Sequence, residues 1–507
     1  MTSVSSEMNS RLLLGAALII ACVLMLPAFQ GTPLIIDEHV AFWILDADGP
    51  GTLWSRSLDC AATPPLSSLV QRLFLLLGGR SESVFRASSV ICFLLAIVVT
   101  WQIGRQVFGD LAGGLAATIL AWHPEVLDCV RIARPYGLTV LLAAVAVWTT
   151  MNWERRPRSR RWQAGWILAC AALAWTHYVN VPLVVLLWLG LWGNRWLPHT
   201  ISHTRLLQSA AVVAVLSLPL VRPVWRLFEL SRFLNYQVEP LGLGDIVHPF
   251  WWAGLPAALI AAVLTGKRAS ARVTGSEGRA SVLKLVLWSV VPLLGILAVS
   301  RGNMTSLADP RYRVVYAPAA AVLIAGLLSF RVDRWGALIG VVVLIALSSV
   351  VSGDAPWRSQ YLDSPNAEDW RQTADKIRRD GQPDDLILAQ TGLVESNLVA
   401  IKLDDPVFLD YVASRIGRFY LRTSHRRVPL PSIYLSGTGI ERFYEGVMNE
   451  TSAKNASLWI AGTGDTDVGR ESIDWIIIQA EHNGLTRVDR FRLGSVVLLR
   501  YRRTRAR

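Results

Sequence analysis

The chain has 507 residues, of which 52% are hydrophobic and only 17% are charged, and its formal net charge is +12. Soluble globular proteins carry about 25% charged residues, so the composition excludes an ordinary wholly soluble protein. The deficit is local, because residues 352–507 hold 22 Lys and Arg against 21 Asp and Glu. The excess positive charge of residues 1–351 lies in short loops between apolar runs, which indicates membrane topology and argues against a nucleic-acid partner.

About eleven apolar runs are candidates for helices that cross a membrane, which requires roughly 17–25 residues. The first lacks a small-residue cleavage site followed by a soluble chain, so we expect a retained anchor and not a signal peptide. The shorter run 66–77 contains Gln71 and Arg72 and is expected to lie at the interface without crossing. The predicted spans are 12–29, 86–105, 110–124, 135–152, 162–177, 179–194, 206–224, 249–265, 282–300, 314–330 and 335–351.

The distribution of charge predicts the orientation of these spans. With the N-terminus in the cytoplasm, the inner loops hold 15 Lys and Arg against 5 acids, and the outer loops hold 11 against 12. The basic run 154–161 is the strongest marker of an inner loop. An odd number of spans then places residues 352–507 outside the cytoplasm. We therefore predict a multi-pass protein of the plasma (inner) membrane with an extracytoplasmic C-terminal domain.

The C-terminal part alternates helix and strand patterns, which predicts a small soluble α/β domain over residues 352–507. No Gly-rich phosphate-binding fingerprint stands in the strand-turn-helix context that it needs. The five cysteines all precede residue 352. A disulfide between Cys60 and Cys129 is allowed by the topology, although two free thiols are favoured. The expected helices are 366–379, 407–421 and 439–452, and the expected strands are 385–390, 457–461, 475–480 and 495–501.

The first outer loop, 30–85, begins with an acidic pair, Asp37 and Glu38, directly after the first span. Apolar surroundings disfavour a charged carboxylate, so an acid beside a membrane must be solvated or engaged. Both side chains can simply point into water. They can also be the groups that do chemistry at the membrane surface. Further along, Pro64 and Pro65 set a turn from which the interfacial helix can start.

Polar residues also gather in the other outer loops. An arginine there can pair with an acid for structure, snorkel beside a span, or grip a phosphate with its forked donors. A His-Tyr pair at an outer turn is more typical of an interfacial anchor than of a ligand. These alternatives stay open on residue type alone. The candidates are Asp128, Arg134 and Tyr136 in and after the second outer loop, His177 and Tyr178 at the next outer turn, and Arg311 and Arg313 in the last outer loop.

The order of these pieces resembles the GT-C superfamily of polyprenyl-phosphate-dependent glycosyltransferases, within the branch of the protein O-mannosyltransferases and the lipid A aminoarabinose transferase. The likeness rests on Asp37-Glu38 after the first span, the Pro-Pro-Leu stretch at 64–66, the segment from Phe85 to Gly109, and the stretch 133–138 that opens the fourth span. It covers roughly residues 30–190. Relatives often have His before the two prolines, where this chain has Thr63, so an imidazole role at that position is in doubt.

The resemblance implies an inverting enzyme that moves a sugar from a polyprenyl phosphate to a lipid, glycan or protein acceptor at the outer face. Asp37 would act as general base with support from Glu38. Arg134, Arg311 and Arg313 would bind the lipid phosphate. Asp128 matches an acid that some relatives use near a metal or the sugar. No cofactor is certain; a divalent cation held by Asp37 and Asp128 stays open, since several relatives manage without one.

Two other functions compete with glycosyl transfer. A transporter or lipid flippase typically has ionisable residues inside its spans and internal repeats. Here the spans are almost free of charge, no internal repeat is found, and the acids cluster in the outer loops, which argues against transport. A non-catalytic scaffold, whose soluble domain binds an outer partner, conflicts with nothing in the sequence. Neither the sugar nor the acceptor can be deduced from these residues.

Overall fold

The computed structural model describes two compact units, and each is presented by itself. The described residues are 2–61, 63–193, 201–234, 276–300, 309–331, 334–352, 359, 361–363, 367–422, 425–430, 438–454, 456–463 and 467–503. The bundle unit comprises the described parts of residues 1–30, 63–229 and 237–361. The sheet unit comprises the described parts of residues 31–62, 230–236 and 362–507.

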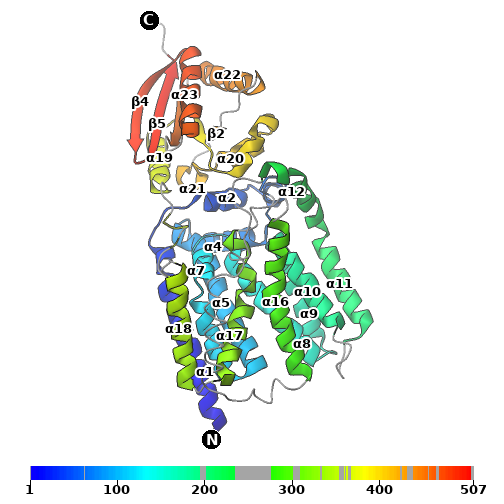
Figure 1. Ribbon diagram of the computed structural model, residues 1–507. Coiled ribbons are helices and arrows are strands. Elements are labelled where there is room, and N and C mark those ends of the chain that lie inside the picture. Colours follow the sequence, from blue (N-terminus) through cyan, green and yellow to red (C-terminus); the bar gives the residue numbers. More distant parts are fainter. Residues whose placement is uncertain are drawn as a thin grey trace. The chain divides into compact units, whose positions relative to one another are not determined.

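The bundle unit consists of helices, most of which run side by side (Figure 1). Its centre is α5, which packs against α6, α8 and α17. The longer helices are α1 (Thr2–Leu24), α4 (Leu66–Gly78), α5 (Glu82–Phe108), α6 (Asp110–Ala121), α7 (Pro124–Val130), α8 (Tyr136–Arg155), α9 (Arg160–Ala174), α10 (Val181–Gly193), α11 (His203–Ser217), α12 (Val221–Leu234), α16 (Ser276–Ser300), α17 (Ala317–Arg331) and α18 (Arg334–Ser352). Short 3-10 turns are η1 (Leu26–Phe29), η3 (Tyr178–Asn180), η5 (Leu218–Leu220), η7 (Pro310–Tyr312) and η8 (Val314–Tyr316).

Helices occupy every predicted span except 249–265, which lies outside the described residues. Within the described part of the chain, four helical segments are long and apolar enough to cross a membrane by length and composition: Glu7–Leu24, Glu82–Phe108, Tyr136–Arg155 and His203–Glu229. Several of the others are shorter, so the number of about eleven crossings stays a prediction. Residues 66–77 form the 13-residue helix α4, which is too short to cross a bilayer, and it begins after Pro65 as expected.

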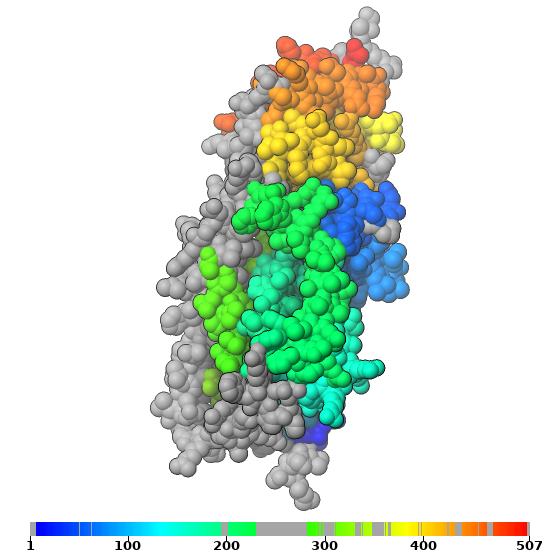
Figure 2. All heavy atoms as spheres, turned by 90° about the vertical axis from the view of Figure 1, so that its right-hand side faces the viewer, coloured from blue at the N-terminus to red at the C-terminus, as the bar shows by residue number. Residues whose placement is uncertain are grey.

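The helices α11 and α12 and the turn between them, drawn in green in Figure 2, expose several large apolar side chains. Leu218, Val221, Trp225 and Phe228 are each 60–64% exposed. Exposing so many large apolar side chains side by side would be unfavourable in water. This surface therefore fits a lipid environment, as the sequence predicts.

The sheet unit is built on a five-stranded sheet in the order β2-β1-β3-β5-β4. The strands β2, β1 and β3 are parallel, and β5 and β4 add to them in antiparallel pairing. Its elements are α2 (Ile36–Leu45), α3 (Pro50–Ser55), the π-helical turn η2 (Arg56–Cys60), α19 (Ala367–Asp380), β1 (Leu386–Gln390), η9 (Val394–Ile401), α20 (Pro406–Val412), α21 (Arg418–Leu421), β2 (Arg426–Leu430), α22 (Thr438–Ala453), β3 (Leu458–Thr463), α23 (Asp467–His482), β4 (Leu485–Leu493) and β5 (Val496–Arg503).

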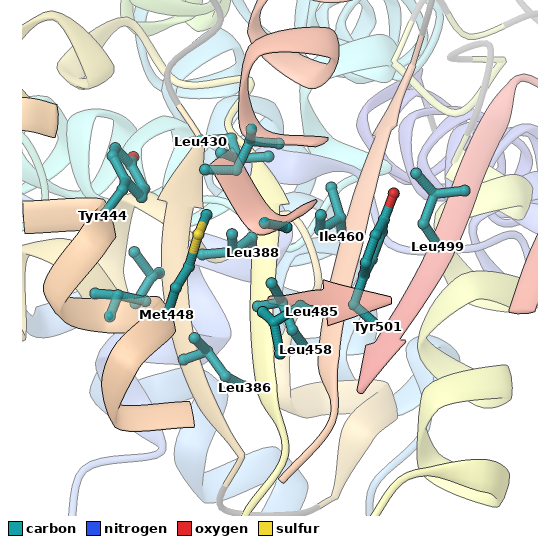
Figure 3. Close-up of a cluster of buried hydrophobic side chains, with 14 of the residues drawn as sticks. Leu386, Leu388, Leu430, Tyr444, Met448, Leu458, Ile460, Leu485, Leu499 and Tyr501 are labelled. Carbon is teal, nitrogen blue, oxygen red and sulfur yellow. The ribbon is translucent and has the colours of Figure 1, made fainter. Parts of the chain in front are cut away.

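The main core of the sheet unit lies where α22 and α23 pack on one face of the sheet (Figure 3). Leu388, Leu458 and Ile460 of the central strands contribute side chains that are at most 1% exposed. Tyr444 and Met448 of α22 are fully buried against them. The predicted α/β domain is therefore present over the described C-terminal residues.

Three details of the predicted domain were wrong. The expected strand 475–480 belongs to α23, because Ile473, Ile476 and Ala480 are buried at helical spacing while Ile478 is 62% exposed. The expected helix 407–421 is broken into α20 and α21. The strands β2 and β4 were missed, because Pro429 and the alternating charges of residues 485–493 hide the strand pattern. Both are edge strands, where proline and charge are tolerated.

The sequence placed the first outer loop with the membrane part, but residues 31–61 pack in the sheet unit. Val40, Trp43 and Ile44 of α2 join a buried cluster with Phe408 and Val412 of α20. The loop that carries Asp37 is therefore bound to the C-terminal segment by an apolar core. All five cysteines are free, and Cys60 and Cys129 belong to different units.

The predicted topology can be tested by cysteine labelling in intact cells. Arg158 lies in the exposed turn between α8 and α9, and Lys454 lies exposed after α22. We expect a membrane-impermeant maleimide to label Lys454→Cys from outside and to label Arg158→Cys only after permeabilisation, with the unsubstituted protein as background. Labelling of Arg158→Cys in sealed cells would show that the turn between α8 and α9 lies outside, which would contradict the predicted orientation.

Candidate functional site

Three segments of the bundle unit that are distant in sequence meet around α7. They are α7 with the residues that lead into α8, the turn after α9, and residues 309–316 with η7 and η8. Helix α7 starts at Pro124, whose missing N–H suits the first helical position. Helix α8 approaches α5 very closely at Gly137, where an added Cβ would lie 2.2 Å from the Ser89 carbonyl oxygen. This close packing fixes the start of α8 and the side chains beside it.

One ion pair in this region is fully internal. The Arg313 guanidinium donates to Glu125 Oε1 at 2.7 Å, and each side chain is only 7% exposed. The Tyr316 hydroxyl donates to the other carboxylate oxygen, Glu125 Oε2, at 3.2 Å. Both oxygens of Glu125 are thus used within the protein. Arg313, predicted as a phosphate ligand, has its charge balanced by this carboxylate.

A second acidic group surrounds Cys129 of α7. Burial, and then the carboxylates of Asp128, Asp309 and Glu125, raise the pKa of the Cys129 thiol well above its usual value. Asp128 accepts a short hydrogen bond from the Ser359 hydroxyl. Asp309 accepts a hydrogen bond of 3.1 Å from the Tyr361 hydroxyl. Cys129 is therefore a protonated core residue, and Asp128 is anchored to the segment that follows α18.

A cationic group lies beside these acids. Burial, followed by the guanidinium charges of Arg134 and Arg311, lowers the pKa of His177 to about 3. His177 lies in the turn beyond α9 and accepts from the Val179 backbone N–H through Nδ1 at 3.3 Å. Arg311 also pairs with Asp309 at 3.2 Å, and both side chains stay partly exposed, at 23% and 28%. Arg134, Arg311 and a neutral imidazole thus converge from three separate segments.

The aromatic candidates surround this cationic group. The His177 ring lies 5.2 Å from Tyr312 and 6.4 Å from Tyr178, centroid to centroid. Arg311 lies over the Tyr312 ring at 5.2 Å. Tyr136, at the first position of α8, is 2% exposed. The rings of His177, Tyr178 and Tyr312 thus form one aromatic group beside Arg311.

The other arginine of the second outer loop is structural. Arg131 is 1% exposed and donates from Nε and Nη2 to the Leu24 carbonyl oxygen at 3.1 and 2.8 Å. Leu24 is the last residue of α1, where carbonyl groups have no partner within the helix. Arg131 therefore caps α1, and Arg134 is the arginine of this loop that has a cationic neighbour.

The acidic pair lies in the sheet unit, at the first turn of α2. Glu38 is fully buried, and its Oε2 accepts from the Ile35 backbone N–H at 3.1 Å, so it caps its own helix. Asp37 is partly exposed. Asp37 is in the first turn of α2, where an acid interacts favourably with the helix dipole. The structure thus separates the two acids into a buried cap and a more accessible carboxylate.

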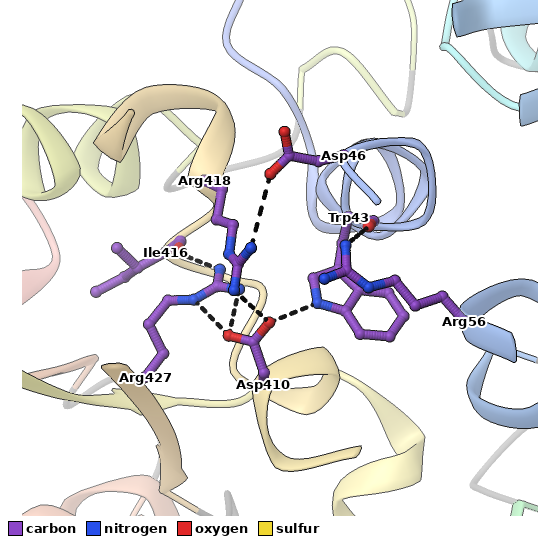
Figure 4. Close-up of polar contacts among 7 residues, drawn as sticks. All are labelled: Trp43, Asp46, Arg56, Asp410, Ile416, Arg418 and Arg427. Atoms are coloured by element: carbon purple, nitrogen blue, oxygen red, sulfur yellow. Dashed lines mark hydrogen bonds and ion pairs between the residues drawn. The ribbon is translucent and has the colours of Figure 1, made fainter. Parts of the chain in front are cut away.

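The far end of α2 is held by a partly buried carboxylate, Asp410 of α20, whose side chain is 18% exposed (Figure 4). Its Oδ2 accepts from the Trp43 indole at 2.7 Å, and its Oδ1 accepts from Arg427 Nη2 at 2.6 Å. Arg418 pairs with Asp410 at 3.2 Å. Burial raises the pKa of Asp410, but the two guanidinium groups and the indole hydrogen bond outweigh it and lower the pKa overall. Sequence reasoning missed Asp410, because nothing in its local pattern marks it.

Among the described residues, no group of three His, Cys, Asp or Glu side chains lies together as a metal site of that kind would require. Asp37 belongs to the sheet unit and Asp128 to the bundle unit. The divalent cation that the resemblance leaves open therefore stays a prediction.

The sequence and the fold of the chain are similar to those of known glycosyltransferases. Residues 62–224 match the family described as dolichyl-phosphate-mannose-protein mannosyltransferase. A crystal structure of ArnT from Cupriavidus metallidurans bound to undecaprenyl phosphate superposes with a TM-score of 0.61 at 14% identity, covering 96% of this chain and 97% of ArnT. The chain has the fold of the GT-C glycosyltransferases. The resemblance stated from the sequence is thereby confirmed.

Two further structures agree with the GT-C fold. ArnT from the same organism in the apo state superposes with a TM-score of 0.59 at 14% identity and covers 96% of this chain and 97% of ArnT. The Archaeoglobus fulgidus oligosaccharyltransferase tethered with an acceptor peptide gives 0.51 at 12% identity, covering 95% of this chain and 73% of that protein. No curated protein matches the chain by sequence.

The bundle unit brings together most of the predicted substrate residues. Arg134, Arg311 and His177 lie together, and Tyr178 adjoins His177. Burial, followed by the neighbouring Cys129 and Asp309, raises the pKa of Tyr361, and Arg311 and Tyr136 also lie near it. Asp37 and Glu38 are in the sheet unit. Residues 359–361, which include Ser359 and Tyr361, were missed, because they follow the last span and match no motif.

If the buried Glu125–Arg313 pair is structural, breaking it should destabilise the protein more than breaking a partly exposed ion pair. Glu125→Gln leaves the buried Arg313 charge unbalanced, and breaking such a pair costs about 3–5 kcal/mol. We expect a large fall in the thermal midpoint of the purified protein. Asp110→Asn breaks a partly exposed pair with Arg105, at 23% and 28% exposure, which is worth about 0.2–1 kcal/mol. Equal shifts in the two variants would contradict the structural role of Arg313.

Proposed function

We propose that this protein is an inverting glycosyltransferase that takes a sugar from a polyprenyl phosphate and passes it to an acceptor at the outer face of the plasma membrane. The observation that carries the proposal is the convergence of Arg134 and Arg311 on the neutral His177 in a chain with the GT-C fold. The family matched by residues 62–224 uses a lipid-linked phosphate donor by its description, and the similar ArnT structure holds undecaprenyl phosphate.

The cationic group has the properties that a lipid phosphate requires. When the bond between the sugar and the phosphate breaks, negative charge grows on the leaving phosphate, and preorganised cations stabilise it. Arg134 and Arg311 are both partly exposed, so a ligand can reach them, whereas Arg313 and Arg131 are buried in structural contacts. Charge-assisted hydrogen bonds to phosphate are about twice as strong as neutral ones. We assign the phosphate to Arg134 and Arg311.

Asp37 is assigned as the general base. The acceptor hydroxyl attacks the anomeric carbon from the side opposite the phosphate, which inverts that carbon. The new bond joins the acceptor oxygen to the sugar, the bond from the sugar to the phosphate oxygen breaks, and the hydroxyl proton passes to Asp37. Glu38 acts indirectly, because its buried carboxylate caps the helix that presents Asp37. The sugar and the acceptor class are not assigned.

The role of Asp37 predicts a large loss of turnover without a loss of protein. Asp37→Asn keeps the shape of the side chain but cannot accept the proton, and positioned proton transfer contributes about 10²–10⁴-fold to rate. We expect turnover to fall by that order in membranes supplied with a labelled polyprenyl-phosphate sugar, with donor and acceptor found first by screening.

Glu38→Gln is the matched comparison, since an amide oxygen can still cap α2. We expect a smaller loss of turnover than for Asp37→Asn. An inactive Glu38→Gln together with an active Asp37→Asn would show that Glu38, and not Asp37, is the base. Full activity in both variants would show that neither acid is the base.

The phosphate assignment predicts weaker donor use in Arg134→Ala and Arg311→Ala. A lost charge-assisted hydrogen bond costs about 1.5–3 kcal/mol. The apparent donor affinity should therefore fall about tenfold or more at unchanged protein level, measured from initial rates against donor concentration. Arg158→Ala, in the exposed turn after α8, is the control and should match the parent. Parent-like donor affinity in both test variants would contradict phosphate binding by Arg134 and Arg311.

A further inference from the structure

The helix that presents Asp37 is held at both ends by residues of the C-terminal segment. Residues 410–427 contact the start, the middle and the end of α2, all within the sheet unit. These contacts go beyond apolar packing, because several are directed hydrogen bonds. Their geometry constrains where the helix, and so Asp37, can lie.

At its start, the segment before α2 is held by Tyr420 of α21. The Tyr420 hydroxyl accepts a hydrogen bond from the buried Leu34 backbone N–H at 2.8 Å. The same ring meets His39 edge to face, with the centroids 5.3 Å apart. The Arg371 guanidinium donates to the Gly31 carbonyl oxygen at 3.0 Å. The backbone on the N-terminal side of Asp37 is thus tied to α21 and α19.

In the middle, α2 and α21 approach each other too closely for any side chain at Gly417. A Cβ there would lie 2.1 Å from His39 Nδ1. The ring of Phe42 meets Phe419 edge to face at 5.1 Å. This contact explains why the expected helix over 407–421 is interrupted: the break at residues 413–417 lets the chain pass directly over α2.

At its end, α2 is held by the Asp410 network. Trp43 donates to Asp410 through its indole N–H, and its carbonyl oxygen accepts from Arg56 Nη1 at 2.7 Å. The Arg56 guanidinium also lies over the Trp43 ring at 4.7 Å. Figure 4 shows Arg418, Arg427 and Trp43 pointing toward the Asp410 carboxylate. Trp43 is therefore fixed from both sides.

Asp37 lies in the first turn of α2, the part of this helix that is least buried. At 3.6 residues per turn, Asp37 points roughly 140–160° away from Phe42 and His39, the residues that face α21. It is partly exposed, whereas residues 38–45 are all buried. The C-terminal contacts thus hold α2 beyond its first turn, and the first turn with Asp37 stays partly exposed.

We infer that Tyr420 is a positioning residue for Asp37, and that the C-terminal domain is therefore part of the catalytic machinery and not an accessory module. This inference rests on the proposed function. Tyr420 touches no reacting atom; it acts by fixing the backbone from which α2 starts. A displacement of about 1 Å at a reacting group can cost on the order of 10²-fold in rate.

Tyr420→Phe tests the inference, because it removes one hydroxyl and keeps the ring against His39. We expect kcat to fall at least tenfold with the donor KM within twofold of the parent, since the phosphate site is untouched. Tyr444→Phe is the control: its buried hydroxyl donates to the Pro429 carbonyl oxygen in the other core of the same unit. We expect parent-like kcat for this control at a similar thermal midpoint.

A double variant separates positioning from general damage. If Tyr420 acts through Asp37, then Tyr420→Phe should lower kcat little further in an Asp37→Asn background. Equal kcat for Tyr420→Phe and Tyr444→Phe, or the same fold-loss in both backgrounds, would overturn the inference. An active Asp37→Asn single variant would instead refute the proposed base, so the two failures are distinguishable.

Discussion

The ion pair between the buried Arg427 and the partly buried Asp410 is the constraint on which the arrangement of the sheet unit depends. An ionised carboxylate removed from water is unfavourable unless cations and hydrogen bonds surround it. Here the partners come from three different elements: Trp43 of α2, Arg418 of α21, and Arg427 of β2. Arg427 is 3% exposed and also donates to the Ile416 carbonyl oxygen at 3.0 Å. None of these groups can move without leaving a buried charge unbalanced, so the first loop and the C-terminal domain fold as one body.

The bundle unit contains two kinds of ion pair, one buried and one partly exposed. Glu125 and Arg313 balance each other in the interior and stabilise the contact between α7 and η8. Arg311 pairs with Asp309 where both stay partly exposed, and it shares its surroundings with Arg134 and His177. A pair that is fully desolvated serves structure, because exchanging its partner would cost too much. A half-exposed group of cations can exchange water for an incoming phosphate, which is why burial separates the two kinds of arginine.

Much of this architecture could be predicted from the sequence, since apolar runs of bilayer length and the bias of Lys and Arg are strong local signals. The helices of the bundle and the α/β character of the C-terminal domain follow from them. Residue type also identified Arg134, Arg311 and His177 as candidates that the structure brings together. The pairing of Arg313 with Glu125 joins residues 188 positions apart, and the contact of Trp43 with Asp410 joins residues 367 apart. No local pattern encodes such contacts. The short apolar run Trp475–Ala480 was predicted to be a strand, because its local pattern does not show that it belongs to a longer helix.

The central claim is that the bundle unit recognises a lipid-linked phosphate. Native mass spectrometry of the purified protein, titrated with a polyprenyl phosphate and with the unphosphorylated polyprenol of the same length, tests it most directly. The account predicts a one-to-one complex with the phosphate at concentrations where the alcohol does not bind, and loss of that selectivity when Arg134 and Arg311 are both replaced by Ala. Equal binding of the two lipids, or unchanged selectivity in the double variant, would contradict it.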